Sequence, residues 1–459
     1  MTSYPQAIAW FLVHVHPLRT RADAEDYLSR LALIPARFDE LVARLASSET
    51  RGALAPRFLL ARAADEIDAI GRGSDGTPPL LARFVAAAAD LYDVDARALD
   101  ELVGEAERLV REVVSPACAR LAATVREIAT RVTDDVGVWR ATDGDAYYRY
   151  LLRVYTTTDV SAEEIFDLGL REVSRIQAEV RLAASALGYA ETGSLSSLFA
   201  RLRADRGVVS GTPAVTACRE LVHEAPQLVG TAFALDLHSD LAVDPGENIA
   251  YFVEGARDGS RPETFYVPVD QVRPTYSLAS LVYHETIPGH ALQIQAARDA
   301  RLPAFLDGVS FAAFTEGWAT YAERLAWELG AYEDDPYGNI GRLQEELFRA
   351  ARLVVDPGLH AMGWTYDQAV AYLIDATGLS EATVRDEVDR YVVQPGQAVA
   401  YGVGLYRLLD LRAKAEEALG EAFDLARFHE AVLSCGSVPL SVLEDVVEAF
   451  IASCPASQP

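Results

Sequence analysis

Apolar residues recur at intervals of three and four along most of the chain, which is the spacing of one face of an α-helix. The pattern is clear between about residues 22 and 131, for example over 24–45 and 81–110, and Pro and Gly residues interrupt it. Farther along, Ser161 is followed three residues later by Glu164, which is typical of a capping box and predicts a helix that continues to about Leu187. The chain up to about Leu187 is therefore predicted to be a helical bundle more than a sheet.

The region from Asp244 to Pro274 changes character, because Gly, Pro and Asp separate short β-prone runs over 250–253 and 264–269. These runs predict two or three strands. A strand at this point could pair with an extended peptide, and Tyr266 is then a candidate for substrate binding. The alternative is an ordinary hairpin that packs on the helices.

Helical spacing returns at Tyr276 and continues to the end of the sequence, with a turn at Pro395-Gly396. We therefore predict a mainly α fold with a small β-sheet. A chain of 459 residues, 50% of them hydrophobic, can bury a large core and suggests two or more lobes. We place a soft border near residue 135, with an N-terminal helical lobe over 1–135 and a larger lobe over 136–459, or else one continuous fold.

Charge and composition exclude several classes of function. The net charge of −27 and the pI near 4.7 argue against nucleic acid or an anionic membrane as a partner. No stretch approaches the roughly 20 apolar residues needed to cross a bilayer, and residues 1–19 lack a basic region followed by an apolar one. We expect a cytoplasmic protein, in which the scattered cysteines are reduced thiols: Cys118, Cys218, Cys435 and Cys454.

The segment 283–290, Tyr-His-Glu-Thr-Ile-Pro-Gly-His, is the strongest chemical signal in the sequence. In common zinc hydrolases two histidines four residues apart share a helical face, and the glutamate between them activates water. Here His284 and His290 are six residues apart, which leaves them roughly 120° apart on a regular helix. Pro288 and Gly289 supply a break that can turn His290 back toward His284. This predicts a metal site in which Glu285 is the general base.

A third ligand is predicted from the helical segment 314–323, where Glu316 and Glu323 are seven residues apart on one apolar face. Two histidines and a glutamate with one open position form the ligand set of a hydrolytic zinc centre, so Glu316 completes the predicted site and Glu323 supports it. One Zn²⁺ per chain is expected, although such ligands also accept manganese, cobalt or iron. The alternative is that the histidines are satisfied core residues and that Glu316 caps or bridges helices.

A second group of polar residues follows the turn at Pro395-Gly396. Tyr401 is a candidate donor to the oxyanion that forms when water attacks a carbonyl. Arg407 and Arg412 are candidates to hold a substrate carboxylate. The alternative is that Tyr401 and the arginines are packing or surface residues of a C-terminal helix, and for either arginine this alternative is at least equally well supported. His360 and His429 could carry protons or support the ligands, and such histidines are more often core or surface residues.

At these residues the chain resembles the bacterial family catalogued as domain of unknown function 885, which is similar to gluzincin metallopeptidases such as carboxypeptidases and oligopeptidases. The resemblance extends over most of the chain. It rests on His284-Glu285 with Pro288-Gly289-His290 and Leu292-Gln293, on Glu316-Gly317-Trp318-Ala319, on 352–356 with Gly358, His360 and Trp364, on 395–398 with Tyr401, on Phe428-His429, and on Pro439-Leu440.

The resemblance implies a largely helical, gluzincin-like metallohydrolase fold with a deep cleft and a catalytic lobe that holds the zinc ligands. The sequence also departs from the family pattern. Ala291 stands where a second histidine is frequent, Gly402 where lysine follows the tyrosine, and Glu263 and Pro268 where glycine and asparagine are commoner. These departures put the substrate preference in doubt.

The predicted function is zinc-dependent hydrolysis of amide bonds, by a metallopeptidase of carboxypeptidase or oligopeptidase type that acts on a short peptide or peptide-like substrate. Exopeptidase action is weakly favoured, because an arginine could bind a terminal carboxylate. One alternative is a repurposed metalloenzyme that acts on a small amide in biosynthesis. Another is a non-catalytic helical protein that binds peptides. The sequence does not define the oligomeric state.

Overall fold

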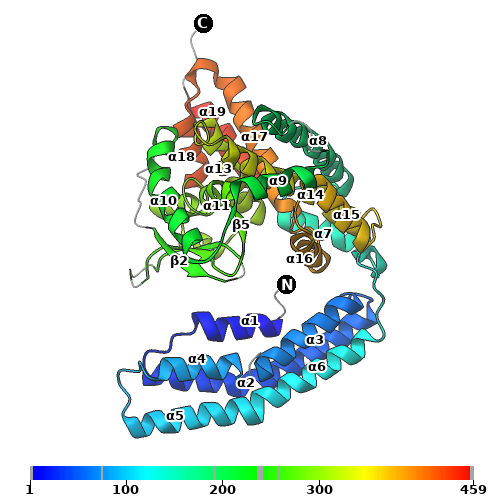
Figure 1. Cartoon of the computed structure of the whole chain (residues 1–459), viewed down its shortest axis with the longest axis vertical. Coiled ribbons are helices and arrows are strands. Elements are labelled where there is room, and N and C mark those ends of the chain that lie inside the picture. The colour runs from blue at the N-terminus through cyan, green and yellow to red at the C-terminus, as the bar shows by residue number, and fades with distance from the viewer. Residues whose placement is uncertain are drawn as a thin grey trace. The chain divides into compact units, whose positions relative to one another are not determined.

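Two compact units make up the structure, Met1–Gly144 and Asp145–Pro459 (Figure 1). This computed structural model describes residues 4–73, 76–189, 193–234, 241–247, 249–256, 259 and 261–454. Helices account for 73% and strands for 4% of the structure, so the prediction of a mainly α fold with a small sheet is confirmed.

The first unit is helical throughout its described elements. They are α1 (Tyr4–Trp10), α2 (Arg21–Thr50), α3 (Arg57–Arg72), α4 (Pro79–Ala88), α5 (Ala96–Leu109) and α6 (Ser115–Ala129), with short π-helices over Phe11–Val15 and Val110–Val114. Helix α3 lies along α6, and α2 packs against both α5 and α6 (Figure 1). Apolar side chains of these helices form one core, which includes Tyr27, Leu31, Phe84, Val114 and Leu121.

The structure adds detail to two expectations for this unit. The apolar pattern over 81–110 is divided between α4 and α5, because the Asp95 carboxylate accepts the Ala98 N–H at 2.8 Å and starts a new helix there. The unit also extends past residue 135 to Gly144. The segment after α6 is tied back by backbone hydrogen bonds from the Arg57 N–H to Thr133 O and from the Thr142 N–H to Arg51 O.

The second unit contains the remaining elements. Its helices are α7 (Gly144–Thr156), α8 (Ala162–Ala186), α9 (Leu195–Arg206), α10 (Gly211–Val229), α11 (Leu278–Glu285), α12 (His290–Asp299), α13 (Ala312–Glu328), α14 (Pro336–His360), α15 (Tyr366–Thr377), α16 (Glu381–Val393), α17 (Val399–Leu419), α18 (Leu425–Ser434) and α19 (Leu440–Ser453). Its strands are β1 (Val208–Val209), β2 (Ala242–Gly246), β3 (Tyr251–Val253), β4 (Thr264–Pro268) and β5 (Arg273–Pro274).

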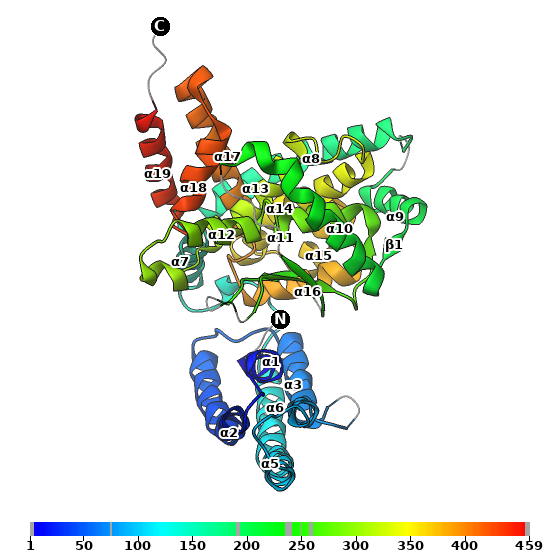
Figure 2. The same cartoon turned by 90° about the vertical axis from the view of Figure 1, so that its left-hand side faces the viewer.

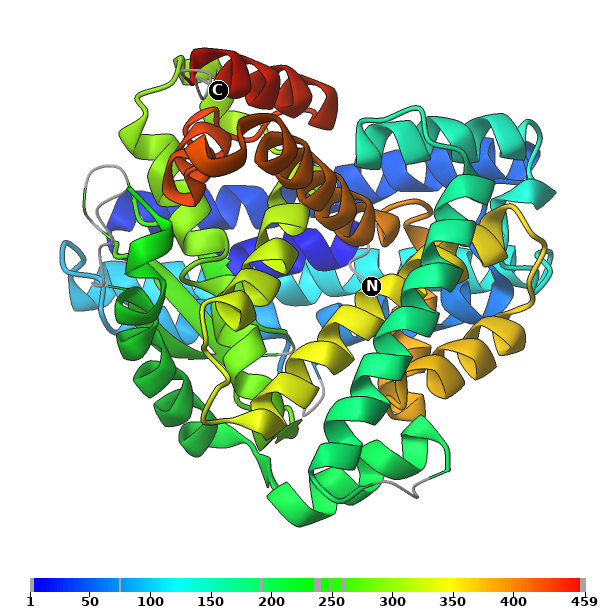
Figure 3. The same ribbon diagram turned by 90° about the horizontal axis from the view of Figure 1, so that it is seen from above.

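Long helices organise this unit. Helix α14 lies along α8, as the yellow and green helices of Figure 3 show, and α14 also packs on α15 and α17. Helices α17, α18 and α19 gather at the C-terminal end, where α19 contacts both of the others (Figure 2). The predicted capping box at the start of α8 is confirmed, since Ser161 and Glu164 each accept the other's backbone N–H. The predicted turn at Pro395-Gly396 separates α16 from α17.

A small sheet lies beside the helices in the order β2-β4-β3, with β2 parallel and β3 antiparallel to β4. The runs predicted over 250–253 and 264–269 become β3 and β4, and β3 is an edge strand among the described residues. The face of β2 and β4 shares an apolar core with α10 and α11, which includes Val215, Val222, Phe265, Val267 and Val282. The sheet, α10 and α11 therefore share one apolar core.

Two further expectations can be compared with the structure. The four cysteines form no disulfide, in agreement with reduced thiols. Among the helices that the structure describes, none combines the length and the apolar character required to cross a membrane.

Candidate metal centre

The two predicted histidine ligands lie on either side of a break between α11 and α12. Helix α11 ends at Glu285 and α12 begins at His290, so the predicted interruption of the helix is confirmed. Gly289 is required there, because a Cβ atom at this residue would lie 1.9 Å from the carbonyl oxygen of His284. The Trp318 indole N–H donates to the Pro288 carbonyl at 2.8 Å and fixes the position of the break.

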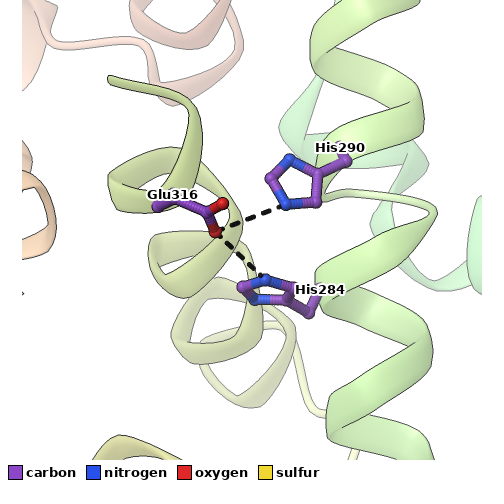
Figure 4. A group of neighbouring side chains, drawn as sticks. All are labelled: His284, His290 and Glu316. Carbon is purple, nitrogen blue, oxygen red and sulfur yellow. Dashed lines mark ion pairs between the residues drawn. The ribbon is translucent and has the colours of Figure 1, made fainter. Parts of the chain in front are cut away.

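Glu316 meets both histidines, as Figure 4 shows. The Nε2 atoms of His284 and His290 each lie 3.6 Å from the same oxygen, Glu316 Oε2. The two imidazole rings are 4.9 Å apart and inclined by 86°. One potential ligand atom from each of the three residues lies within 4.8 Å of the others.

The two distances to Glu316 fit ligands of one metal ion better than they fit hydrogen bonds. Nitrogen and oxygen ligands at about 2.1 Å from zinc lie about 3.4 Å from one another in a tetrahedron, close to the observed 3.6 Å. A hydrogen bond would require a shorter separation. Glu316 Oε2 is buried without a hydrogen-bond partner, a costly state unless a cation compensates it. The three residues therefore fit a divalent cation.

The opposite side of His284 is held by Glu323, which lies two turns after Glu316 on α13. His284 Nδ1 lies 2.8 Å from Glu323 Oε1, and because a carboxylate only accepts, Nδ1 carries the hydrogen. This leaves the Nε2 lone pair free to bind a metal ion, the arrangement common in histidine metal sites. Ser280 donates to the other oxygen of Glu323, and Arg349 lies 2.8 Å from Oε1.

The site is strongly ionised in the absence of a metal. Burial lowers the pKa of His284, but Glu316 and Glu323 outweigh that effect and raise it to about 9. Burial also raises the pKa of Glu316, yet the two histidines bring it far below its usual range. Burial raises the pKa of Glu323 in the same way, and Arg349 and His284 bring it below its usual value. Both carboxylates are therefore anionic, and a metal ion must displace a proton from His284.

Glu285 lies beside the three potential ligands at the wall of a cavity. The cavity measures about 520 Å³, and its wall includes Glu285, the two histidines, Glu316 and Tyr401. Burial raises the pKa of Glu285, against the effect of the neighbouring histidines. A carboxylate with a raised pKa is a stronger base, so Glu285 is well suited to accept a proton from water in the cavity.

Tyr401 reaches the cavity because α17 packs closely on α13. A Cβ atom at Gly404 would lie 1.9 Å from Ala313 O, so only glycine permits this approach. The guanidinium of Arg352 stacks on the Tyr401 ring at 4.5 Å. Burial, and then the charge of Glu316, raise the pKa of Tyr401, so that its hydroxyl remains a proton donor.

The two arginines predicted to bind substrate are not among the residues that line the cavity. Arg407 is paired with Glu444 of α19. Arg412 donates to Glu328 at 2.6 Å and to the Tyr321 hydroxyl at 3.0 Å. Their charges are compensated within the helical framework, and the structure gives no support to the idea that either one holds a substrate carboxylate.

Other candidates also lie outside the cavity wall. His429 is buried, accepts from the Tyr321 hydroxyl at 2.8 Å and donates to Ala232 O at 2.8 Å. Burial lowers its pKa to about 4, so it is a neutral core residue. His360 is also buried, and its Nε2 contacts the Tyr391 carbonyl at 3.0 Å. Tyr266 on β4 stacks on Tyr251, which does line the cavity, with ring centroids 5.0 Å apart.

Ala291 and Gly402, the two residues nearest the site that depart from the family pattern, have structural roles. Ala291 is buried at the start of α12, where its N–H donates to Thr286 O at 3.1 Å. Gly402 allows α17 to pack on α14, because a Cβ atom there would lie 2.8 Å from the Leu353 side chain. Both residues therefore belong to the packing around the break and the tyrosine.

Sequence reasoning missed Arg349 and Ser280, which support His284 through Glu323. Arg349 lies in an apolar stretch of α14, Leu347 to Val355, that also contains Arg352. A charged residue inside such a stretch needs a buried partner. That rule was applied to Glu316 and Glu323, and it would have identified Arg349 as well.

Comparisons with known proteins support a shared fold. No curated protein matches the chain. The model of the family described as "Bacterial protein of unknown function (DUF885)" matches residues 1–447. A solved protein from Colwellia psychrerythraea, described as a candidate lipoprotein, is 29% identical with a TM-score of 0.93, over 97% of this chain and 79% of its own. Another candidate lipoprotein, of unknown function, from Shewanella oneidensis is 19% identical with a TM-score of 0.72, over 97% and 82% of the two chains.

Proposed function

The chain belongs to the bacterial protein family DUF885, whose function is unknown. We propose that this member is a zinc-dependent hydrolase of amide bonds with a gluzincin-like catalytic unit. One observation carries the proposal. The Nε2 atoms of His284 and His290 converge at 3.6 Å on a buried, unpartnered oxygen of Glu316, at the wall of a cavity that also contains Glu285.

The residues of the cavity have distinct parts in this reaction. Zinc held by His284, His290 and Glu316 would lower the pKa of water and polarise the substrate carbonyl. Glu285 accepts the proton of the attacking water, since burial raises its pKa, and then returns that proton to the leaving nitrogen. Tyr401, which also lines the cavity, donates a hydrogen bond to the developing oxyanion.

The sheet supports a peptide as the substrate. Strand β3 is the edge of the sheet among the described residues, and Tyr251 and Phe252 of β3 line the cavity. An extended peptide can add to such an edge through main-chain hydrogen bonds. The proposed enzyme is therefore a metallopeptidase that binds its substrate along β3 and cleaves it beside Glu285.

Elemental analysis tests the metal site. The purified protein, before and after zinc titration, should contain about one zinc ion per chain, and a His284→Ala variant that remains folded should lose it. If the protein retains no transition metal even after titration, the proposal fails and a non-catalytic peptide-binding protein becomes the better explanation.

A peptide library tests the chemistry. Glu285→Gln should keep the metal and lower turnover by at least about a hundredfold, because the amide cannot accept the proton. Glu417→Gln, an exposed substitution on α17, should behave like the wild type. Substantial activity in Glu285→Gln would remove Glu285 from its proposed role. Turnover of a small amide metabolite without any turnover of peptides would instead favour a biosynthetic enzyme.

The location of the protein remains a separate proposal. We propose the cytoplasm from the sequence, whereas the similar protein of Colwellia psychrerythraea is described as a candidate lipoprotein. Cell fractionation followed by immunodetection distinguishes the two locations. Recovery of the protein with the membrane fraction would contradict the cytoplasmic prediction.

A further inference from the structure

We infer that the cavity selects peptides with a bulky apolar side chain next to the cleaved bond and does not bind a terminal carboxylate. This inference rests on the proposed function and specifies its substrate class. It departs from the expectation of exopeptidase action, which depended on an arginine that binds the end of the chain.

Apolar side chains form about half of the cavity wall. Its apolar side chains come from β3 and the residues before it, and from α12 and the segment that follows it: Ile249, Phe252, Ile294, Ala297, Leu302, Leu306 and Val309. Each of them keeps part of its surface exposed, up to 64% for Ile249. A contiguous apolar surface left open beside polar catalytic groups marks a ligand-binding site. An apolar side chain of the substrate would cover it.

The charges of the wall do not favour a carboxylate. Arg298 is the one arginine or lysine among the described residues of the cavity wall. It lies 3.0 Å from Glu254 and 3.3 Å from Glu263, and it donates to Gly255 O at 2.6 Å. Two carboxylates already compensate its charge. A terminal carboxylate of the substrate would meet two further acids, since Glu285 and Glu316 line the same cavity.

The first experiment compares matched peptides on the wild-type enzyme. They carry leucine, glutamate or lysine beside the scissile bond, and each is made with a free or an amidated C-terminus. We expect kcat/KM to be at least about tenfold higher for the leucine peptide than for the glutamate and lysine peptides. The free energy gained when a leucine side chain is transferred from water into an apolar site is large enough for a factor of this size. Amidation should change kcat/KM by less than about threefold. Preference for a charged side chain, or a tenfold loss on amidation, would overturn the inference.

A matched pair of variants tests the apolar wall directly. Leu306 and Phe305 are neighbours in the short helix Ala304–Gly308, and Leu306 lines the cavity, whereas Phe305 does not and is 73% exposed. Leu306→Lys should lower kcat/KM for the leucine peptide about tenfold and raise it for the glutamate peptide. Phe305→Lys should retain the wild-type preference. Equal effects of the two substitutions would contradict the inference.

Binding measurements distinguish this inference from the proposed function. The Glu285→Gln variant is used with fluorescent peptides, so that affinity is measured without turnover. If the leucine peptide binds best but neither metal nor hydrolysis is found in the wild type, the proposed function fails and the apolar site stands. If the wild type hydrolyses all the peptides equally, the inference fails and the proposed function stands.

Discussion

Glu323→Gln tests whether the support behind His284 matters for metal binding. Glu323 contacts Nδ1 of His284 at 2.8 Å, and both side chains are almost fully buried, with 4% and 7% of their surfaces exposed. Glutamine keeps the size and one acceptor oxygen of glutamate but removes the negative charge. The histidine then loses the partner that holds its hydrogen on Nδ1 and makes Nε2 a better ligand.

The size of the effect can be estimated from this geometry. Loss of a carboxylate behind a ligating histidine typically weakens metal binding ten- to a hundredfold, or by about 1.4–2.7 kcal/mol. A short contact in a buried site is little screened by solvent, so we expect a loss toward the hundredfold end. Removing one partner of a buried ion pair can also cost about 3–5 kcal/mol of stability. Here Arg349 keeps Glu345 at 3.2 Å, so the stability loss should be smaller and the variant should fold.

Zinc affinity should be measured by competition with a coloured chelator, and stability by urea unfolding of the metal-free protein. Glu345→Gln is the matched control, because it also removes a carboxylate from Arg349, but Glu345 has no contact with His284 in the structure. We expect only Glu323→Gln to weaken zinc binding. Wild-type affinity in folded Glu323→Gln, or an equal loss in Glu345→Gln, would refute the role assigned to Glu323.

Two further predictions concern Tyr401 and the protons of the site. Tyr401→Phe should keep the metal and the KM while kcat falls about a hundred- to a thousandfold, measured on the best peptide; an unchanged kcat would exclude the hydroxyl from catalysis. The pKa of metal-free His284 is raised to about 9, so the ring is protonated below that pH and must lose its proton to bind a metal. Apparent zinc affinity should therefore rise about tenfold per pH unit up to pH 9 and then level off. Calorimetry in buffers of different ionisation heat should show that a proton is released when zinc binds. A zinc affinity that does not change between pH 6.5 and 9 would contradict the raised pKa.

Features that depend only on residues close together in the sequence were predicted correctly. The capping box at Ser161 and the break at Pro288-Gly289 are both determined within a few residues, and both are present in the structure. Strand β2 was harder to locate, because its sequence Ala-Val-Asp-Pro-Gly is poor in strand-forming residues. This segment is a strand because it pairs in parallel with β4, about twenty residues later. A local sequence pattern does not show such a pairing.

Long-range contacts also explain why the first unit ends at Gly144, a little beyond the soft border expected near residue 135. Nothing near residue 135 indicates that the chain continues to belong to the first unit. The segment does so because its backbone returns to the ends of α2 and α3, with hydrogen bonds at Arg51 and Arg57. Arg407 and Arg412 illustrate the same limit at the level of side chains. The sequence shows that both residues are charged. It does not show that they pair with acidic residues on other helices, and these pairs are what compensates their charge.

Helix α14 contains two buried arginines from which part of the site could have been predicted. This helix is buried along most of its length, and an arginine inside it must find an acidic or aromatic partner. Arg349 reaches Glu323, which holds His284, and Arg352 stacks on Tyr401. The two arginines are three residues apart, so they lie on neighbouring positions of one face. A helix that contributes no residue to the cavity wall thus contacts, through two arginines, both the partner of a proposed metal ligand and the proposed oxyanion donor.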